Sequence, residues 1–289
     1  MAFWAAGGGA VRASDCARAV KLLYGKAADE SAVTLFLIDA LYAPCNKSRI
    51  MPSHDYLANL ESVNAYAESV RQRGAALFEG DFGTLGAVMI SCAAKRGEER
   101  EKTIESLSEA CGSQEGWVLV LDDVLPETIE RPQERQERVS LLAMMAGLIA
   151  GWDYFLFLED DLEFNPHLKR NLQEWEPLLD GVVHMASLYN PCVAGPNYPC
   201  PYANTFIADP RRVYGSQAFL LSRQCARYVA RHWWTVKGMQ DIKISRLASR
   251  LGPIFYHSPS LVQHAGVRST WTDDSRFHTA PDYAEEFCA

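Results

Sequence analysis

An apolar segment that ends abruptly in acidic residues constrains this chain more than any other feature. Phe155–Leu158 is followed directly by Glu159, Asp160 and Asp161, and Glu163 comes two residues later. Carboxylates packed this closely repel one another, and a divalent cation that neutralises them makes the arrangement favourable. Hard cations such as Mg²⁺ or Mn²⁺ are held by one or two carboxylates together with substrate phosphates. The run therefore predicts a metal-bridged phosphate site at the end of a strand.

Strands and helices alternate on the N-terminal side of this run. The apolar and helical patterns predict, in order, a strand at Leu85–Cys92, a helix at Glu98–Cys111, a strand at Trp117–Leu121, a helix at Arg135–Ala150 and a strand at Tyr154–Leu158. This alternation is typical of an α/β fold with a mostly parallel sheet flanked by helices. Ligands of such sheets bind beyond the carboxyl ends of the strands, where both Asp122-Asp123 and the acidic run fall.

The pattern is less regular after the acidic run. It predicts a helix at Pro166–Leu179, a strand at Val182–Leu188, a long loop at Asn190–Asp209, a strand at Ser216–Leu221, helices at Arg223–Trp233 and Gln240–Leu251, and a short strand at Ile254–Tyr256. A loop as long as that of Asn190–Asp209 is usually functional or mobile.

The first eighty residues have no clear place in this scheme. Val33–Leu41 is apolar and fits a strand or a helix, while Asp55–Gly74 has helical spacing. We treat residues 1–80 as an N-terminal appendage of unknown role and residues 81–289 as the main domain.

Composition limits the kinds of binding partner and the cellular location that we expect for this protein. The chain has 289 residues, 48% of them hydrophobic, which is enough to form a core. A net charge of −8 argues against broad affinity for nucleic acid or anionic membranes. The N-terminus lacks the pattern of a signal peptide, and no run of about twenty apolar residues would span a bilayer. We therefore expect no membrane span and a cytoplasmic protein.

The eight cysteines are scattered and form no CxxC pair, so a cysteine-based metal site is not expected. Cys92 and Cys225 lie in apolar segments and are expected to be buried thiols. Cys192 and Cys200 flank a Pro-rich stretch and would pair only in an oxidising compartment.

The segment Leu158–Phe164 resembles the metal-binding DxD element of nucleotide-sugar glycosyltransferases of the GT-A fold, and is closest to the EDDLE form of N-acetylglucosaminyltransferases. Further elements follow in that family's order: a small-residue turn at Tyr214–Phe219, an acid that opens a helix at Gly238–Ile242, and a histidine within Leu261–Gly266. The resemblance covers about residues 84–270. It implies a Rossmann-like GT-A fold, a UDP-sugar donor such as UDP-N-acetylglucosamine, and a Mn²⁺ or Mg²⁺ cofactor.

The resemblance assigns a role to each acidic residue and to the histidine. Asp161 would bind the metal directly, and His264 would complete the contacts to metal or diphosphate through a ring nitrogen. Glu159 and Asp160 would orient the ribose or support the metal ligand. The cation would stabilise the charge that develops on the departing diphosphate.

Catalysis would fall to Asp241, as the base that deprotonates the acceptor hydroxyl in an inverting reaction. Gln240 stands where the family usually has an acid, and this departs from the pattern. Gly215 would let the backbone approach the donor sugar, with Ser216 and Gln217 beside it in the same turn.

Three more residues would contact the nucleotide. Asp122 matches a position that binds the base, Arg96 follows the first strand of the pattern, and Arg138 lies on the helix before the acidic run. The acceptor is not specified by the sequence and would be a hydroxyl of a glycan, a protein, a metabolite or a modified nucleic acid.

Simpler roles remain open for all of these residues. The acidic run fits a solvated turn, Asp241 fits an acid that complements a helix dipole, and His264 fits a structural histidine. Gly215 fits a tight turn, while Arg96, Asp122 and Arg138 fit ordinary surface or turn positions.

Two other functions also fit the chain. A sugar nucleotidyltransferase would place acids near a metal on an α/β sheet, but its Gly-rich basic phosphate loop is poorly matched by Cys92–Gly97. A carbohydrate- or protein-binding module would keep the fold without the chemistry.

Overall fold

The strand before the acidic run lies inside the main sheet of the protein. The computed structural model describes residues 54–91, 96–121, 132–191, 200–265 and 279–289. Strand β4 (Tyr154–Leu158) belongs to an eight-stranded sheet, and all five of its side chains are buried. A strand covered on both faces needs a continuous apolar sequence, which is what this segment has.

The N-terminal half forms the predicted β-α-β arrangement. Its elements are β2 (Gly83–Ser91), α4 (Gly97–Cys111), β3 (Trp117–Leu121) and α5 (Pro132–Ala150), which leads into β4. Strands β3 and β4 both pair in parallel with β2, so their carboxyl ends lie at the same edge of the sheet. The five elements predicted between residues 85 and 158 are confirmed, with bounds that differ by three residues at most.

The C-terminal half extends the sheet. It contributes β6 (Met185–Ser187), β7 (Thr205–Ala208), β8 (Ala218–Ser222) and β9 (Ile254–His257), with α8 (Arg223–His232), a 3₁₀ helix (Trp233–Thr235) and α9 (Gln240–Ala248) between β8 and β9. With β1 (Phe78–Gly80) at one end, the strand order is β1-β2-β4-β8-β6-β9-β7, with β3 beside β2. Three strand pairings are parallel and four are antiparallel, so the sheet is more evenly mixed than the sequence predicts.

Three predictions for this half are wrong in detail. The helix expected at Pro166–Leu179 is broken into α6 (Leu168–Gln173) and α7 (Glu176–Leu179). Pro177 has no N–H to donate to the carbonyl of Gln173, so α6 cannot run on through it, whereas proline is tolerated in the first turn of α7. The loop expected at Asn190–Asp209 contains strand β7, which pairs antiparallel with β9 at the end of the sheet. The strand expected at Val182–Leu188 is shorter, because only β6 pairs.

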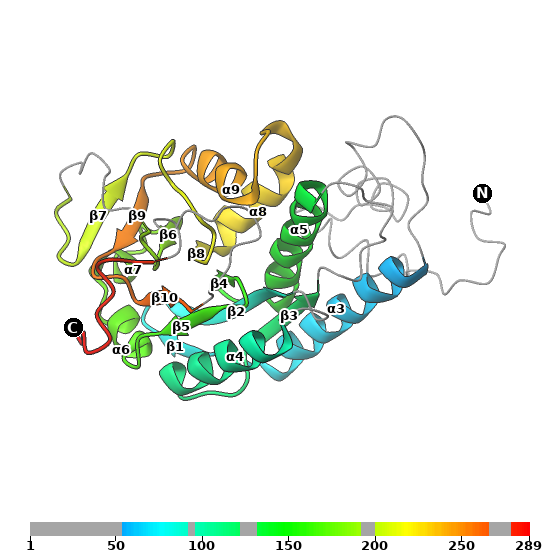
Figure 1. The fold of residues 1–289 in the computed structure, drawn as a ribbon, viewed down its shortest axis with the longest axis horizontal. Coiled ribbons are helices and arrows are strands. Elements are labelled where there is room, and N and C mark those ends of the chain that lie inside the picture. Colours follow the sequence, from blue (N-terminus) through cyan, green and yellow to red (C-terminus); the bar gives the residue numbers. More distant parts are fainter. Residues whose placement is uncertain (1–53, 92–95, 122–131, 192–199, 266–278) are drawn as a thin grey trace.

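Helices cover both faces of the sheet, with α5, α8 and α9 on one side and α4 and α6 on the other (Figure 1). The faces can be read from β4 itself. Phe155 and Phe157 pack into the cluster beneath α5 and α8, whereas Leu156 and Leu158 pack into the cluster beneath α4 and α6. This division follows from the alternation of side chains along a strand.

A small second sheet holds the two ends of the site together. Strand β5 (Leu162–Phe164) begins directly after the acidic run and pairs antiparallel with β10 (Val262–His264). His264 lies opposite Leu162 in this register, and the N–H of Ala265 donates a 2.8 Å hydrogen bond to the carbonyl of Asp161. The pairing therefore fixes the late histidine beside the last acid of the run.

Part of the expected appendage packs onto the main fold. Helix α3 (His54–Arg73), predicted from helical spacing, places Val63, Ala67 and Val70 in the core cluster that includes α5. Strand β1 (Phe78–Gly80) pairs with β2. The packed unit thus includes residues before position 81, whereas Val33–Leu41 lies outside the described residues.

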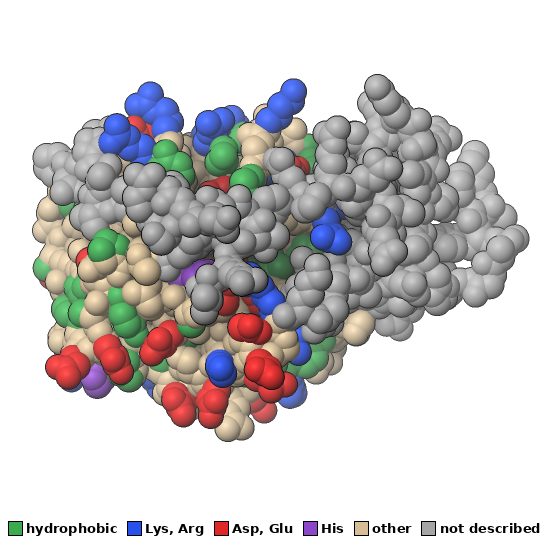
Figure 2. All heavy atoms as spheres, in the orientation of Figure 1, with side chains coloured by type: hydrophobic (Ala, Val, Ile, Leu, Met, Phe, Trp, Pro, Cys, Tyr) green, Lys and Arg blue, Asp and Glu red, His purple; other side chains and the backbone are tan. Residues whose placement is uncertain are grey.

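The surface charge is unevenly distributed. Figure 2 shows acidic side chains gathered along the side of the molecule that carries α4 and α6, and Lys and Arg side chains along the side that carries α8 and α9. Within the described part of the chain, no helix is long and apolar enough to cross a membrane. Cys225 is a buried free thiol, as expected, whereas Cys92 and the pairing partner Cys192 lie outside the described residues.

Candidate active site

The three acids that follow β4 point to three different sets of partners. The backbone N–H of Glu159 still bonds to the sheet, donating to the carbonyl of Gln217 at 3.1 Å. Asp160 and Asp161 are buried, while Glu159 is partly exposed. The three carboxylates therefore lie in different environments.

Asp160 is held by the first β-α connection. Its Oδ2 accepts a hydrogen bond from the hydroxyl of Ser91 at 2.7 Å, and its Oδ1 accepts one from Nη1 of Arg96 at 3.0 Å. The hydroxyl of Thr103 on α4 donates to the carbonyl of Asp160 at 2.9 Å. Burial raises the pKa of Asp160, while Ser91 and Arg96 oppose the shift.

Asp161 is the most enclosed of the three carboxylates. Its Oδ2 lies 2.5 Å from Nη1 of Arg96 and 3.2 Å from Nε2 of His264. Burial acts to raise the pKa of Asp161, but His264 and Arg96 outweigh it and hold this pKa below its ordinary value. Asp161 in turn raises the pKa of His264 against the effect of burial.

The other oxygen of Asp161 has no such partner. Oδ1 is buried, and it accepts no hydrogen bond from the residues that the structure describes. Buried polar atoms are nearly always hydrogen-bonded, so this carboxylate oxygen is available to a hydrogen-bond donor or a cation. A cation is the natural partner for it, because the carboxylate carries negative charge.

Glu159 begins a chain of buried polar side chains. Its Oε1 accepts hydrogen bonds from the hydroxyl of Ser216 at 2.8 Å and from Nε2 of Gln240 at 3.2 Å. Gln240 also donates to Ser216, and its own carbonyl accepts from Ser140 on α5. Burial and the nearby charge of Asp161 raise the pKa of Glu159 to about 7.

This hydrogen-bonded network explains why position 240 is a glutamine and not the acid that the related motif has. The amide of Gln240 donates to Glu159, which an ionised acid at the same place would be unable to do. A second carboxylate there would instead lie against the first and repel it. Glutamine is therefore the residue that fits the buried network.

Asp241 lies in the first turn of α9 and faces the turn before β8. Its Oδ2 accepts a hydrogen bond from the backbone N–H of Gly215 at 3.1 Å, and its Oδ1 accepts one from the N–H of Ile242 at 2.8 Å. Burial raises the pKa of Asp241, and these hydrogen bonds only partly oppose it. A carboxylate with a raised pKa that is held by backbone groups is suited to accept a proton.

Gly215 cannot be replaced without a change in this turn. Its φ is 75°, and a Cβ at this position would lie 2.0 Å from Oε1 of Gln217. That Oε1 is itself buried and without a hydrogen-bond partner among the described residues. Gly215, Ser216 and Gln217 thus form one turn that joins Asp241 to Glu159.

The predicted site residues divide into three groups. Those brought together at one edge of the sheet are Arg96, Glu159, Asp160, Asp161, Gly215, Ser216, Gln217, Asp241 and His264. Arg138 is buried on α5, two residues before Ser140. Asp122 lies outside the described residues.

Several residues of the site were missed by sequence reasoning. Ser91 and Thr103 hold Asp160, and Ser140 anchors Gln240 from α5. Lys243 joins α9 to α5 through a 2.9 Å ion pair with Glu137. Ser91 alone carried a signal, since it ends the first predicted strand at the edge where ligands bind.

Few of the described side chains in the site could act as metal ligands. Among the residues that the structure describes, no three His, Cys, Asp or Glu side chains are grouped so as to hold a metal ion. A Mg²⁺ or Mn²⁺ site needs only one or two protein carboxylates when phosphates supply the other ligands. The unpartnered Oδ1 of Asp161 fits such a site, with His264 beside it to orient the carboxylate.

Comparison with protein-family models finds no match for this chain, and no curated protein matches it either. Interpretation of the site therefore depends on its own geometry.

Proposed function

We propose that this chain is a metal-dependent glycosyltransferase of the GT-A fold that transfers a sugar from a UDP-sugar to a hydroxyl acceptor. The observation that carries the proposal is the buried Oδ1 of Asp161 at the carboxyl end of β4, which accepts no hydrogen bond from the described part of the chain. The carboxyl ends of parallel strands are where such sheets bind nucleotides. The reaction also needs a base. Asp241 has a raised pKa and is bonded to the turn at Gly215, so it is suited to this role.

The metal, Mn²⁺ or Mg²⁺, would be held by Asp161, with His264 beside it and phosphate oxygens in the other positions. When bound, it would stabilise the negative charge of the departing diphosphate. Arg96 lies next to the same carboxylates and carries a permanent positive charge. We assign Arg96 to the diphosphate as well as to these two carboxylates.

The remaining donor contacts come from the turn and the polar chain. The side chain of Gln217 fills the space beside Gly215, so the backbone there is not open to the sugar. The buried Oε1 of Gln217 accepts no hydrogen bond from the described residues and is instead an acceptor for a sugar hydroxyl. Ser216 and Glu159, tied together at 2.8 Å, support the same wall of the site. Arg138 and Asp122 remain candidates for the nucleoside on sequence grounds alone.

Asp241 is the base of the proposed reaction. Its carboxylate takes the proton of the acceptor hydroxyl as that oxygen forms a bond to the anomeric carbon of the sugar. The bond between the anomeric carbon and the diphosphate oxygen breaks, and its electron pair leaves with UDP. Attack from the face opposite the diphosphate inverts the anomeric configuration.

Replacement of the base tests the proposal. Asp241→Asn keeps an oxygen that can accept from Gly215 but cannot take a proton, so we expect sugar transfer to fall by about 10²–10⁴-fold. Glu99→Gln removes an exposed acid from the first turn of α4 and serves as the control for a helix-dipole role. Sugar transfer and UDP release are measured with a panel of UDP-sugars and Mn²⁺.

Each result has a clear meaning. If Asp241→Asn transfers sugar as fast as Glu99→Gln does, Asp241 is not the base. If wild type neither transfers sugar nor releases UDP from any donor, the glycosyltransferase proposal fails and a binding module is favoured. Release of pyrophosphate from UTP and a sugar phosphate would instead indicate a nucleotidyltransferase.

A further inference from the structure

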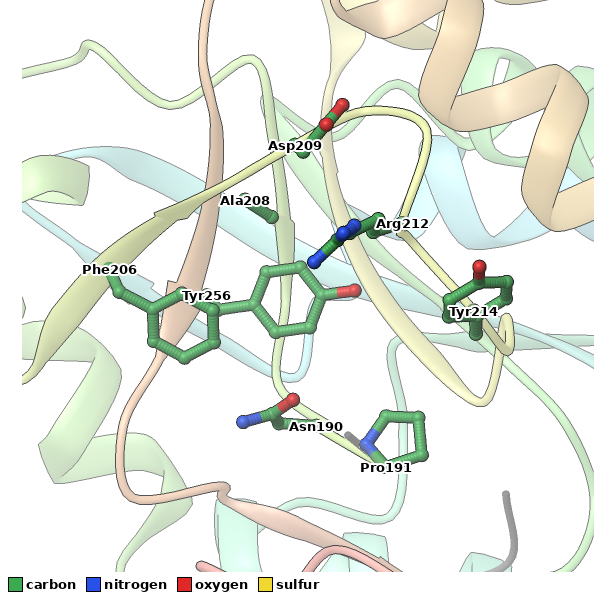
Figure 3. Close-up of a pocket in the computed structure, with 8 residues that line it drawn as sticks. All are labelled: Asn190, Pro191, Phe206, Ala208, Asp209, Arg212, Tyr214 and Tyr256. Atoms are coloured by element: carbon green, nitrogen blue, oxygen red, sulfur yellow. The ribbon is translucent and has the colours of Figure 1, made fainter. Parts of the chain in front are cut away.

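A pocket beside the Asp241 turn is lined by aromatic and polar side chains. It contains about 310 Å³ of atom-free space, part of it open to solvent, and it is bounded by β7, β9, the end of β6 and the segment that crosses from β7 to β8 (Figure 3). Its lining residues are Asn190, Pro191, Phe206, Ala208, Asp209, Arg212, Tyr214 and Tyr256. None of these residues has a role in the donor site described above.

The floor of the pocket is a flat aromatic surface. Phe206 on β7 and Tyr256 on β9 are directly paired across the sheet, and their rings are stacked 4.9 Å apart with 19° between their planes. Tyr214 stands at the rim with 43% of its surface exposed. Flat aromatic rings of this kind pack against the apolar C–H face of a sugar ring.

The pocket lining carries one acid, Asp209, and one arginine, Arg212, and the positive charge of Arg212 acts on Asp209 as well as on a ligand. Asp209–Arg212 includes one acid and two arginines, and Asp209 is bound by Arg211 through two hydrogen bonds of 3.2 and 3.1 Å. The guanidinium of Arg212 extends across the pocket towards Tyr256 (Figure 3). Arginine is suited to carboxylates and phosphates because its planar fork can bind two oxygens at once.

Asn190 supplies a further polar group. Its side chain is buried in the pocket lining, and its Nδ2 makes no hydrogen bond to the described residues. A buried amide donor without a partner is costly, so a ligand oxygen in the pocket would satisfy it. The pocket thus combines an aromatic floor with an amide donor and a cation, which is the set of groups that an acidic sugar needs.

The position of the pocket relates it to both halves of the proposed reaction. Tyr214 immediately precedes Gly215, whose N–H binds the carboxylate of Asp241. On the other wall, Asn190 immediately follows Tyr189, whose pKa is raised by burial and by the nearby charges of Glu159 and Asp161. The pocket lining is therefore continuous in sequence with the turn that binds the base and with a residue that lies near the donor carboxylates.

We propose that this pocket is the acceptor site and that it binds a saccharide bearing a carboxylate or a phosphate. The inference rests on the proposed glycosyltransferase function and adds the class of acceptor. The sugar ring packs on Tyr214, its anionic group pairs with Arg212 towards the stacked rings of Phe206 and Tyr256, and its hydroxyls bond to Asn190. The hydroxyl that reacts faces Asp241.

The test uses acceptors that differ only in charge. Methyl glycosides of glucose and glucuronic acid, of galactose and galacturonic acid, and of mannose and mannose 6-phosphate are compared as acceptors. The donors are UDP-N-acetylglucosamine, UDP-glucose and UDP-galactose in turn, with Mn²⁺, and the readout is the release of UDP above donor hydrolysis. We expect the acidic member of at least one pair to be the better acceptor.

Two variants and two matched controls locate the binding site. Tyr214→Ala is expected to raise the KM for the acidic acceptor by about tenfold, and Arg212→Gln to raise it similarly and to abolish the preference over the neutral partner. Tyr66→Ala truncates a tyrosine with the same 43% exposure on α3, and Arg170→Gln removes an exposed arginine on α6, away from the pocket lining. Both controls should stay within about twofold of wild type.

The outcomes separate this inference from the proposed function. If wild type transfers sugar but prefers neutral saccharides or peptides, or if the pocket variants behave like the controls, the acceptor assignment is wrong and the glycosyltransferase proposal stands. If no UDP-sugar is used or bound by wild type, both proposals fail. Thermal denaturation of each variant verifies that it is folded, as the exposure of Tyr214 and Arg212 leads us to expect.

Discussion

Nε2 of Gln240 lies 3.2 Å from Oε1 of Glu159, a contact that joins the helix of the candidate base to the acidic run across 81 residues of sequence. Gln240 immediately precedes Asp241, and Glu159 immediately precedes Asp160. The relative position of base and donor carboxylates therefore depends on one buried amide. The same contact accounts for a glutamine where the related motif has an acid.

Replacement of this amide by an acid should be harmful in a pH-dependent way. We expect Gln240→Glu to lower the free energy of unfolding by about 2 kcal/mol at pH 8, because a buried carboxylate at position 240 would lie against the partly buried carboxylate of Glu159. The repulsion raises the carboxyl pKa in the folded state, so the folded protein binds more protons than the unfolded one and the loss shrinks as the pH falls to 5. Urea denaturation at both pH values measures it.

A matched exposed pair provides the control for this variant. Gln72 donates to Glu68 on α3 at 3.0 Å, the same chemical contact on the surface, so Gln72→Glu should change stability little at either pH. Equal effects of the two substitutions would show that the buried network is not important for stability.

Arg96 should be required for stability mainly when no metal is bound. It bridges Asp160 and Asp161, so we expect Arg96→Gln to cost about 2 kcal/mol in metal-free buffer by leaving buried carboxylates unpaired. Mn²⁺ should restore part of this loss, since a cation replaces the missing charge. Thermal melts with EDTA and with Mn²⁺ measure both effects.

The control for Arg96 is an exposed ion pair between Arg170, which lies on α6, and Glu174, which is the C-cap of the same helix. Arg170→Gln should have little effect and should not respond to Mn²⁺. The assignment of the acidic cluster to a cation is contradicted if Mn²⁺ stabilises both variants to the same extent.

The rate of transfer should decline at acidic pH because of Asp241. Burial raises the pKa of this carboxyl above its ordinary value, and only the ionised form takes a proton from the acceptor. As the pH falls, the ionised fraction decreases, so kcat should begin to fall at a higher pH than it would with an ordinary aspartate. A pH profile of kcat that stays flat down to pH 4 would argue against this base.

A second titrating group affects stability alone. Burial lowers the pKa of His257 to about 4, although a hydrogen bond to the carbonyl of Pro259 opposes the shift. Between pH 6.5 and about 4 the unfolded chain binds a proton that the folded protein does not, so stability is lost as the pH falls through this window. The loss should amount to about 3 kcal/mol.

Substitution isolates this contribution. In His257→Asn the side-chain amide can still donate to Pro259, but it does not titrate, so the difference in unfolding free energy between wild type and variant should depend on pH only in that window. Parallel curves for the two proteins from pH 7 to pH 4 would show that His257 is not responsible.

Local sequence patterns predicted the parts of the fold that local physics determines. The β-α-β arrangement from β2 to β4 follows from apolar periodicity and from strand and helix lengths, and the acidic run ends β4 as expected. Three-residue strands such as β5 and β10 have too few residues to show a period. The antiparallel pairing of β5 with β10, which brings His264 to Asp161, was therefore not predicted.

The site was predicted as a set of residues but not as a network. The motif indicated Glu159 and Asp241, while the roles of Ser140 and Gln240 depend on how α5 and α9 pack against the sheet. Nothing in the local sequence of Ser91 or Thr103 specifies the contact with Asp160. Such contacts arise from tertiary packing, which a single sequence does not reveal.

The most direct test of the central claim is a thermal-shift titration of wild type, Asp161→Asn and Glu163→Gln with a panel of UDP-sugars, each with Mn²⁺ and with EDTA. Glu163 is an exposed acid on β5 of the same run and serves as the control. We predict that one UDP-sugar raises the melting temperature of wild type and Glu163→Gln by several degrees with Mn²⁺ only, since saturation at about 100 times Kd contributes about 2.7 kcal/mol. Asp161→Asn should show no such rise. Failure of every UDP-sugar to stabilise wild type, or an unchanged response of Asp161→Asn, would contradict the account.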